Sequence, residues 1–339
     1  MEAPMAANDR KRLLREMVFA RRFEERCAEA YHHRDIGGFL HLYPGQEACA
    51  FGVLERARMG HDYVITGYRD HVHAIKSGAD PKAIMAELFA KESGSSRGRG
   101  GSMHIFDADS HFMGGYALVG EPYPLAAGLG KGIKMKETDQ IAICFMGDGA
   151  NNQGTFHETM NMAQLWELPV LFVCENNLYA IGTSLERSTP MHDQYKRAEA
   201  YAMAANQVDG QDVDTVMSAA DEAIDHVRSG KGPYFLELMT YRLRGHSMSD
   251  SGRGYRSEAE IKRWMERDPV YLFRDQLVEE GVINAEEFDD MDRDAQQRLD
   301  DEIVPFAEES PEPDVADLTK YVLDEDTSTA LGQIPGGGK

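Results

Sequence analysis

The chain has 339 residues, of which 42% are hydrophobic, enough for one large α/β domain or two small ones. Its formal net charge of −22, from 58 acidic and 36 basic residues, would repel nucleic-acid phosphates and anionic lipids, so we expect no nucleic-acid or membrane partner. No apolar run reaches membrane-spanning length, and the polar start with Glu2 and Asp9 predicts neither a signal nor a transit peptide.

The first 36 residues predict a helical segment. Residues 8–34 place Leu13, Met17 and Val18 among many charged residues, which is typical of a helix held to the body by one apolar stripe. A Gly-Gly pair, an apolar–His–apolar stretch and a Pro-Gly pair follow in residues 37–48. This pattern predicts an ordered loop that reaches toward a site, with His41 as its candidate functional residue, although a single histidine is more often structural.

Residues 64–71 form a predicted short strand followed by Tyr68 and Arg69. An arginine suits bidentate recognition of phosphate, and a tyrosine can add a hydroxyl contact. The Gly/Ser/Arg stretch 93–102 fits a flexible linker, an RGG-like nucleic-acid segment or an ordered glycine-rich loop, and the acidic charge disfavours the second. Residues 114–120 lead from there into a helix rich in alanine and glycine.

Two buried-type strands dominate the middle of the chain. The apolar runs 141–146 and 170–174 lead into Gly147-Asp148-Gly149 and Glu175-Asn176-Asn177, with 26 residues, 150–175, between Gly149 and Asn176. This pattern predicts one βαβ unit of a parallel sheet. Ligands bind at the carboxyl ends of such strands. An aspartate, an asparagine and a close-approach glycine there favour Mg²⁺ on a diphosphate. The intervening helix is predicted to begin near Asn151-Asn152, with its N-terminus directed at the phosphates.

The remainder of the chain predicts helices at 194–204 and 212–229, a strand at 233–239, and a basic Gly/Ser-rich loop at 241–255 that contains His246. An acidic helical region, 257–325, follows, and we expect residues 326–339 to form a loose tail. The four scattered cysteines, two of them in predicted strands, indicate reduced core thiols. We expect a cytoplasmic protein of bacterial type, or a mitochondrial matrix protein only if a transit peptide has been removed.

The GDG–26–NN spacing resembles the thiamine-diphosphate motif, and the run GDGANNQGTFHETMNMAQLWELPVLFVCENNLYAIGTS is similar to the α subunits of 2-oxoacid dehydrogenases. The similarity covers roughly residues 10–325 and is closest to the pyruvate-specific members. It implies an α/β thiamine-diphosphate-binding domain over residues 37–256, with a parallel sheet, helices on both faces and a helical C-terminal extension.

The resemblance also implies roles for individual residues. It assigns Mg²⁺ to the side chains of Asp148 and Asn177 and the backbone carbonyl of Tyr179. His41 would lie near the substrate carboxylate and His246 would serve the diphosphate or the acyl carrier, as the two catalytic candidates. The other residues implied in cofactor binding are Tyr68, Arg69, Ala117, Val119, Gly149 and Ala150. Ala117 departs from the family pattern, which has glycine at that position.

Half of the machinery is missing from this sequence. Thiamine diphosphate supplies a carbon nucleophile and an electron sink for decarboxylation of a 2-oxo acid, and the protein must hold its diphosphate and activate its aminopyrimidine. Only the first function is visible here, which predicts a partner chain. The resemblance implies an α₂β₂ tetramer whose β subunit contributes an activating glutamate, and a lipoyl-bearing dihydrolipoamide acetyltransferase as acceptor.

Several alternatives remain. RGHSMSDSGRGYRS favours pyruvate, while Pro44, where pyruvate enzymes commonly carry an acidic residue, leaves branched-chain 2-oxoacids or acetoin open. A different class would be a non-catalytic Mg²⁺-nucleotide module, although neither a P-loop nor a GxGxxG after a strand is present, and a third is a scaffold. Ser247 and Ser184 are open as phosphorylation sites, and Gly254 stands where animal relatives carry another regulated serine.

Overall fold

The computed structural model describes residues 5–317, which are built around one parallel sheet. Its six strands are arranged in the order β2-β1-β3-β4-β8-β7, and every neighbouring pair is parallel. The strands are β1 (Tyr63–Gly67), β2 (Phe112–Tyr116), β3 (Ala142–Gly147), β4 (Val170–Asn176), β7 (Ala204–Asp209) and β8 (Tyr234–Met239). The predicted α/β fold with a parallel sheet is confirmed.

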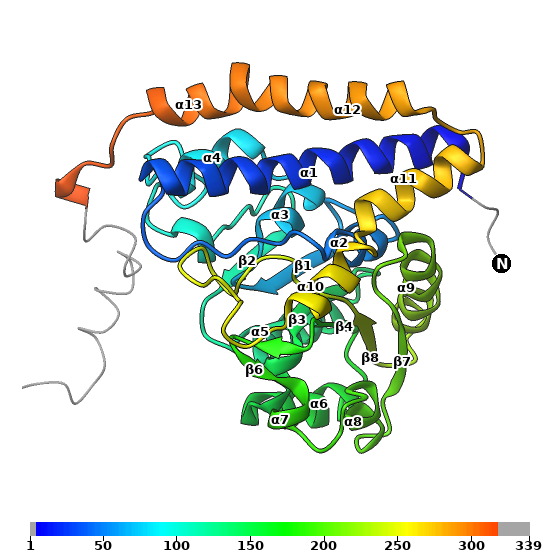
Figure 1. Cartoon of the computed structure of the whole chain (residues 1–339). Helices are drawn as coiled ribbons and strands as arrows, with labels where there is room; N and C mark the ends of the chain where they lie inside the picture. Colours follow the sequence, from blue (N-terminus) through cyan, green and yellow to red (C-terminus); the bar gives the residue numbers. More distant parts are fainter. Residues whose placement is uncertain (1–4, 318–339) are drawn as a thin grey trace, which may run out of the picture.

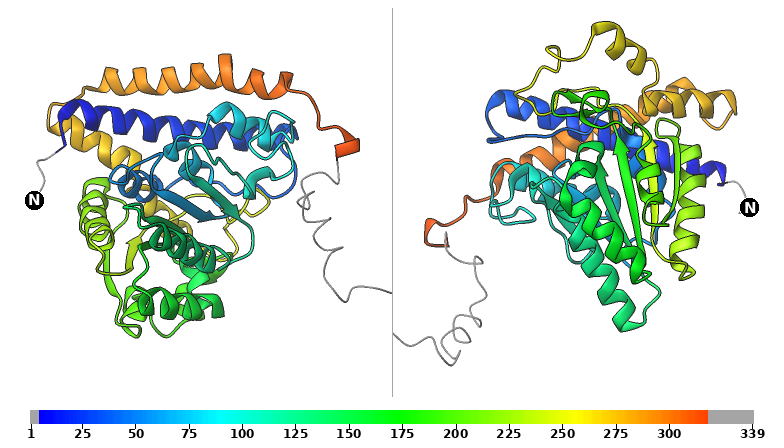
Figure 2. Two further views of the ribbon diagram at one scale, coloured as in Figure 1. Left: turned by 180° about the vertical axis from the view of Figure 1, so that it is seen from behind. Right: turned by 90° about the horizontal axis from the view of Figure 1, so that it is seen from below.

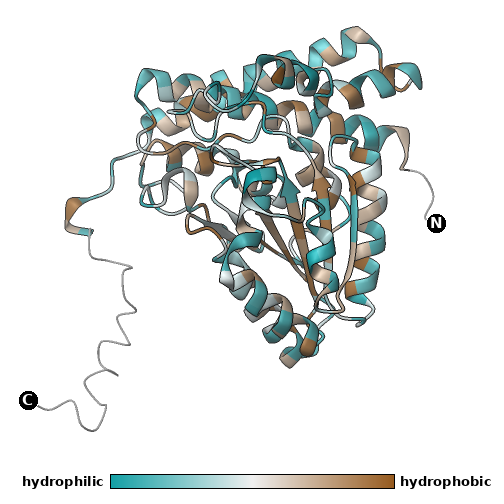
Figure 3. Ribbon diagram, turned by 60° about the horizontal axis from the view of Figure 1, so that its bottom comes forward, coloured by the Kyte–Doolittle hydropathy of each residue, from teal (hydrophilic) through white to brown (hydrophobic). Residues whose placement is uncertain are grey.

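Helices cover both faces of the sheet, which explains why β3 and β4 are apolar runs rather than alternating sequences. Ile143 and Phe145 belong to one buried cluster, whereas Cys144 and Met146 belong to another on the opposite face. The first cluster includes α2 (Glu47–Leu54) and α9 (Val213–Arg228), and the second includes α5 (Pro122–Lys136) and α6 (Gly154–Leu165). Figure 2 shows the strands enclosed between helices, and Figure 3 shows the apolar colouring of the central strands.

A separate layer of helices joins the two ends of the described chain. The long helix α1 (Ala7–His33) runs beside α12 (Ala285–Arg298), as Figure 1 shows. Arg21 on α1 is buried and donates to Glu47 (2.6 Å) and Asp268 (2.7 Å), which ties this layer to the sheet domain. The other helices of this C-terminal part are α10 (Glu258–Met265), α11 (Pro269–Glu279) and α13 (Val304–Glu309).

The predicted division into segments 1–36, 37–256 and 257–325 stays a prediction. One continuous buried cluster contains residues from all three segments. Residues 318–325 and the predicted loose tail, 326–339, lie outside the described residues. Within residues 5–317, no helix has both the length and the apolar character needed to cross a membrane. The four cysteines are all buried and unpaired.

Two predicted element boundaries are wrong. The helix predicted at 194–204 ends early: α8 covers only Tyr195–Glu199, and strand β7 begins at Ala204. β7 is a half-buried edge strand whose Asn206 and Gln207 break any apolar run, so its sequence has no strand signal. The helix after Asp148 begins at Gly154 rather than near 151–152, because a short 3₁₀ helix (Asp148–Asn152) intervenes.

The glycine-rich stretch 93–102 is an ordered loop wrapped around one carboxylate. Glu87, at the end of α4 (Pro81–Leu88), is fully buried and accepts four backbone N–H donors, which belong to Ser96, Gly98, Gly100 and Gly101. Gly98 has a φ of +72°, and a side chain there would also meet the Ala90 carbonyl. The linker and nucleic-acid interpretations of this stretch are therefore unnecessary.

Candidate cofactor-binding site

Four adjacent strands, β1, β3, β4 and β8, end at one large cavity of about 690 Å³. Parallel strands present their carboxyl ends at one edge, so residues far apart in sequence meet there. The cavity brings together every residue that the sequence predicted for the site. These are His41, Tyr68, Arg69, Ala117, Val119, Asp148, Gly149, Ala150, Asn177, Tyr179 and His246.

The acidic end of the cavity lies at the tips of β3 and β4, where Gly147 is paired with Glu175. The Asp148 side chain that follows is 1% exposed, and its Oδ2 has no hydrogen-bond partner within residues 5–317. Burial raises the pKa of Asp148 to about 6, against the backbone N–H groups of Asp148 and Asn177 and the charge of Arg242, which lower it. Burial of this carboxylate in its ionised form costs free energy, and a bound cation would remove that cost.

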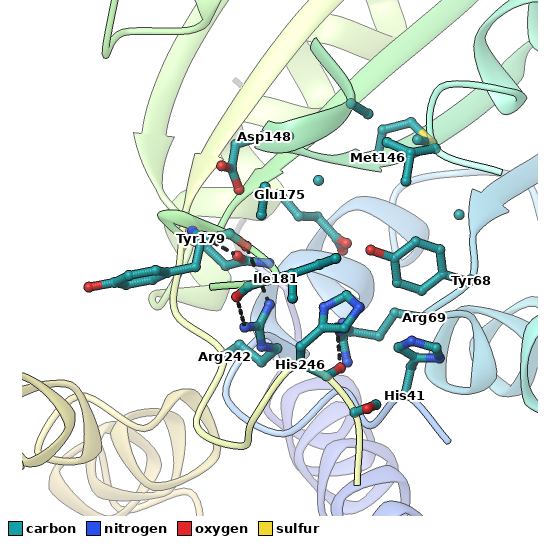
Figure 4. Close-up of a pocket in the computed structure, with 18 of the residues that line it drawn as sticks. His41, Tyr68, Arg69, Met146, Asp148, Glu175, Tyr179, Ile181, Arg242 and His246 are labelled. Atoms are coloured by element: carbon teal, nitrogen blue, oxygen red, sulfur yellow. Dashed lines mark hydrogen bonds between the residues drawn. The ribbon is translucent and has the colours of Figure 1, made fainter. Parts of the chain in front are cut away.

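Two further oxygens accompany Asp148. Asn177 donates through Nδ2 to Gln46 Oε1 (2.9 Å), and its Oδ1 accepts from the backbone of Tyr179 (3.3 Å). The Tyr179 carbonyl accepts a long bond from Arg242 (3.4 Å), and a carbonyl oxygen has a second lone pair that can bind a cation. Asp148 and Tyr179 lie on the same side of the cavity in Figure 4.

Two guanidinium groups provide positive charge. Arg69 donates to the carbonyls of Leu42 and His246, the latter at 3.0 Å, and Arg242 donates to the carbonyl of Ile181 at 3.3 Å. Burial, followed by the charge of Arg242, lowers the pKa of Arg69 to about 10. The charge of Arg242 disfavours the charged form of Arg69, so an anion bound beside the two arginines would be stabilised.

His41, Tyr68 and His246 form a ring cluster beside Arg69 (Figure 4), with centroid separations of 4.6 Å, 5.0 Å and 5.7 Å. Burial, reinforced by nearby positive charge, lowers the pKa of His41 to about 2 and that of His246 to about 4. Both imidazoles are therefore neutral at pH 7. Their Nδ1 atoms are buried and lack a hydrogen-bond partner in the described part of the chain.

A buried polar chain fixes the loop that carries His41. Glu24 Oε1 contacts His71 Nδ1 (2.8 Å), His71 Nε2 contacts Ser102 Oγ (3.0 Å), and the backbone N–H of His41 donates to the same hydroxyl (3.2 Å). Glu24 also accepts from the backbone of Tyr43 (3.1 Å). The first helix thus positions a site residue, a role that its amphipathic pattern did not indicate.

Gly149 and Val119, two further predicted cofactor-binding residues, differ in their packing. A Cβ on Gly149 would lie 2.6 Å from the Ala180 Cβ, so the tight packing of these two segments requires glycine. Val119 is 37% exposed and Leu118 is 70% exposed, which places this segment at the outer side of the cavity. An apolar surface of this kind beside a cavity is typical of a contact with another chain.

Sequence reasoning missed several polar residues of the cavity, among them Gln46, Glu175 and Arg242. Glu175 accepts from the Tyr43 hydroxyl and from His73 Nε2 (3.0 Å). A charged residue at the end of a buried strand was a usable signal for Glu175, and Arg242 likewise follows β8 by three residues. Gln46 had no such signal, since its role depends on contact with Asn177.

The donor set fits Mg²⁺ on a diphosphate. Within residues 5–317 no three His, Cys, Asp or Glu side chains are grouped to hold a metal ion, but Mg²⁺ bound with phosphates needs few protein ligands. One carboxylate with an unpartnered oxygen, one amide oxygen and one carbonyl supply hard oxygen ligands. Two arginines on the same cavity match the remaining charge of a diphosphate.

Comparison with known proteins agrees with this geometry. The chain is 42% identical over 322 residues to the pyruvate dehydrogenase E1 component subunit alpha of Rhizobium meliloti (95% of this chain, 92% of the relative). It is 45% identical over 319 residues to the protein of that name from Zymomonas mobilis (93% and 89%), and 41% identical over 318 residues to that of Porphyra purpurea (92% and 92%). Residues 15–316 match the family described as the dehydrogenase E1 component. The chain therefore belongs to the dehydrogenase E1 component family, the thiamine-diphosphate-dependent 2-oxoacid dehydrogenases that its motifs resemble.

Proposed function

We propose that this chain is the α subunit of a pyruvate dehydrogenase E1 component, which decarboxylates pyruvate oxidatively and passes the acyl group to a lipoyl carrier. The observation that carries the proposal is the buried Asp148 carboxylate, whose Oδ2 lacks a partner within residues 5–317 in a cavity that also holds two arginines. The relatives named for pyruvate favour this substrate over branched-chain 2-oxoacids and acetoin.

The proposed function assigns binding roles to the charged and polar groups described above. Asp148, Asn177 and the Tyr179 carbonyl hold Mg²⁺, while Arg69 and Arg242 neutralise the diphosphate. Thiamine diphosphate, when bound, supplies the carbon nucleophile and the electron sink. The backbone of Ala117–Val119, Gly149 and Ala150 forms the cofactor-facing wall.

The neutral state of the two histidines defines what they can do. A neutral imidazole donates from one ring nitrogen and accepts at the other, so His41 hydrogen-bonds the substrate carboxylate without adding charge. His246 hydrogen-bonds the diphosphate or the arriving acyl carrier through its free Nδ1. An anionic ligand raises the pKa of His246 from about 4, so the imidazole gains basicity only when the cavity is filled.

The partner is a β subunit in an α₂β₂ assembly, and the acyl acceptor is the lipoyl group of an acyltransferase. We infer from the resemblance to 2-oxoacid dehydrogenases that the β subunit contributes the glutamate that activates the aminopyrimidine. The exposed apolar segment 118–119 beside the cavity supports a chain contact at this position.

The test is to purify the chain with the β subunit of the same organism and measure the reduction of an artificial electron acceptor with pyruvate, 3-methyl-2-oxobutanoate and acetoin, because acetoin has no carboxylate and its cleavage releases no CO₂. We expect pyruvate to give the highest kcat/KM, and turnover of 3-methyl-2-oxobutanoate or acetoin above that of pyruvate would refute the substrate assignment. Calorimetry should show Mg²⁺-dependent binding of thiamine diphosphate and no binding of ATP or NAD. Binding of ATP in place of thiamine diphosphate would favour the nucleotide module.

A further inference from the structure

The loop between β8 and α10 separates two cavities. One of its faces lines the large cavity, whereas the other lines a second cavity of about 470 Å³ that is bounded by α10 and by the end of α1. Ser247 and Asp250 line both cavities. The second cavity has no part in the function proposed above.

The second cavity is rich in uncompensated positive charge. Arg244, Arg253 and Lys262 line it, are exposed, and form no ion pair within residues 5–317. Many other cations on this acidic surface are paired, for example Arg22 with Asp292 and Arg26 with Glu29. Three unpaired cations around one hollow therefore form a local positive field in a chain of net charge −22.

A fourth cation holds this arrangement in place. The Arg256 guanidinium is buried and donates to the carbonyls of Arg242 (2.6 Å) and Arg244 (2.9 Å). It also lies over the rings of Tyr241 and Tyr255 at 5.4 Å and 5.5 Å. Arg256 fixes the backbone at Arg244, so the cavity is shaped before any ligand binds.

Two carboxylates and an apolar wall complete the second cavity. Asp250 is already engaged, because it accepts from the backbone of His246 (2.7 Å) and Gly252 (2.8 Å) and from the Tyr255 hydroxyl (2.5 Å). Glu258 is the other carboxylate, so four cations face two carboxylates. The apolar wall consists of Leu42, Leu243, Met248, Ile261 and Met265.

We propose that this second cavity binds a small organic phosphate ester with an apolar or aromatic substituent. Two guanidinium forks and one ammonium match a phosphate dianion, which carries more charge and more acceptor atoms than a carboxylate. The apolar wall receives the substituent, and the volume is that of an ordinary small-molecule site. The ligand would contact the loop that carries His246 from the side opposite the large cavity.

The test uses the assembled enzyme saturated with thiamine diphosphate and Mg²⁺, which fills the large cavity, and phenyl phosphate as the probe in calorimetric titration. We expect saturable binding that weakens at least tenfold in Arg253→Ala and in Arg244→Ala. Arg263→Ala is the matched control, because Arg263 lies next to Lys262 on α10 but does not line the cavity. Inorganic phosphate should bind more weakly than phenyl phosphate, since it lacks the apolar part.

The outcomes separate this site from the cofactor site. Equal phenyl phosphate affinity in the parent and in both arginine variants would overturn the proposal, as would benzoate binding as tightly as phenyl phosphate. Hydrogen exchange at residues 243–256 should slow when the probe binds, and unchanged exchange there would place the probe elsewhere and also overturn the proposal. A chain that failed to bind thiamine diphosphate would refute the proposed function, but the effect of Arg253→Ala on phenyl phosphate would still decide this inference.

Discussion

Replacing Asp148 with asparagine separates the electrostatic cost of this carboxylate from its proposed use. Without ligand, burial raises the pKa of Asp148 from 3.8 to about 6. The folded state therefore holds the proton more tightly than the unfolded state. The penalty is absent below about pH 4, grows as pH rises through the interval between the two pKa values, and is constant above about pH 6.

The two pKa values fix the size of this effect. At pH 7 the ionised side chain destabilises the ligand-free fold by about 3 kcal/mol. Asparagine removes that penalty, but it buries an amide N–H₂ group that has no hydrogen-bond acceptor there, which costs about 1–3 kcal/mol. We therefore expect Asp148→Asn to have a free energy of unfolding between equal to the parent's and about 2 kcal/mol higher at pH 7. At pH 4 the advantage should disappear.

The assay is thermal and urea unfolding of both proteins, with and without Mg²⁺ plus thiamine diphosphate. We expect the ligands to raise the Tm of the parent but not that of Asp148→Asn. Asp70→Asn is the matched control, because Asp70 is buried after β1 with a pKa raised by burial to about 7, yet it does not line the cavity. Asp70→Asn should keep the ligand-induced shift, and a full shift in Asp148→Asn would refute the cation assignment.

Three further substitutions test other parts of the account. Arg242→Ala removes a charge-assisted donor and should weaken thiamine diphosphate binding about 10- to 100-fold by calorimetry, and unchanged affinity would remove Arg242 from the diphosphate site. Glu87→Gln replaces a carboxylate that accepts four backbone N–H groups and should lower the free energy of unfolding by about 2–4 kcal/mol in urea; a loss below about 0.5 kcal/mol would contradict that role. Ser102→Ala strands the His71 ring nitrogen and the His41 N–H, so we expect lower stability by about 1–3 kcal/mol and reduced kcat in the assembled enzyme. Unaltered kcat would show that this chain does not position His41.

The predictable part of the fold is the part encoded by local pattern. The apolar runs of β3 and β4 are buried on both faces, so their sequences have no polar alternation and identify a parallel sheet. Strand β7 lies at the sheet edge and is half-buried along its length, and its pairing with β8 is a tertiary contact that no local signal encodes. The sequence therefore predicted no strand at β7.

The same distinction applies to the site. Asp148 and Asn177 were predictable because each follows a strand directly, and parallel strands bring their ends together. Gln46 and the Glu24–His71–Ser102 chain were not, because their roles rest on contacts between segments 19 to 131 residues apart. The neutral state of His246 was also hidden from the sequence, since it results from burial beside two arginines.

The central claim is that Asp148 and Asn177 hold the divalent cation that anchors the cofactor diphosphate. The most direct measurement is a crystal structure grown with Mn²⁺ and thiamine diphosphate, with the metal located by its anomalous scattering. The account predicts one metal peak about 2.1 Å from Asp148 Oδ2, shared with Asn177 Oδ1 and the Tyr179 carbonyl. A peak elsewhere, or a bound diphosphate with no metal at Asp148, would contradict it.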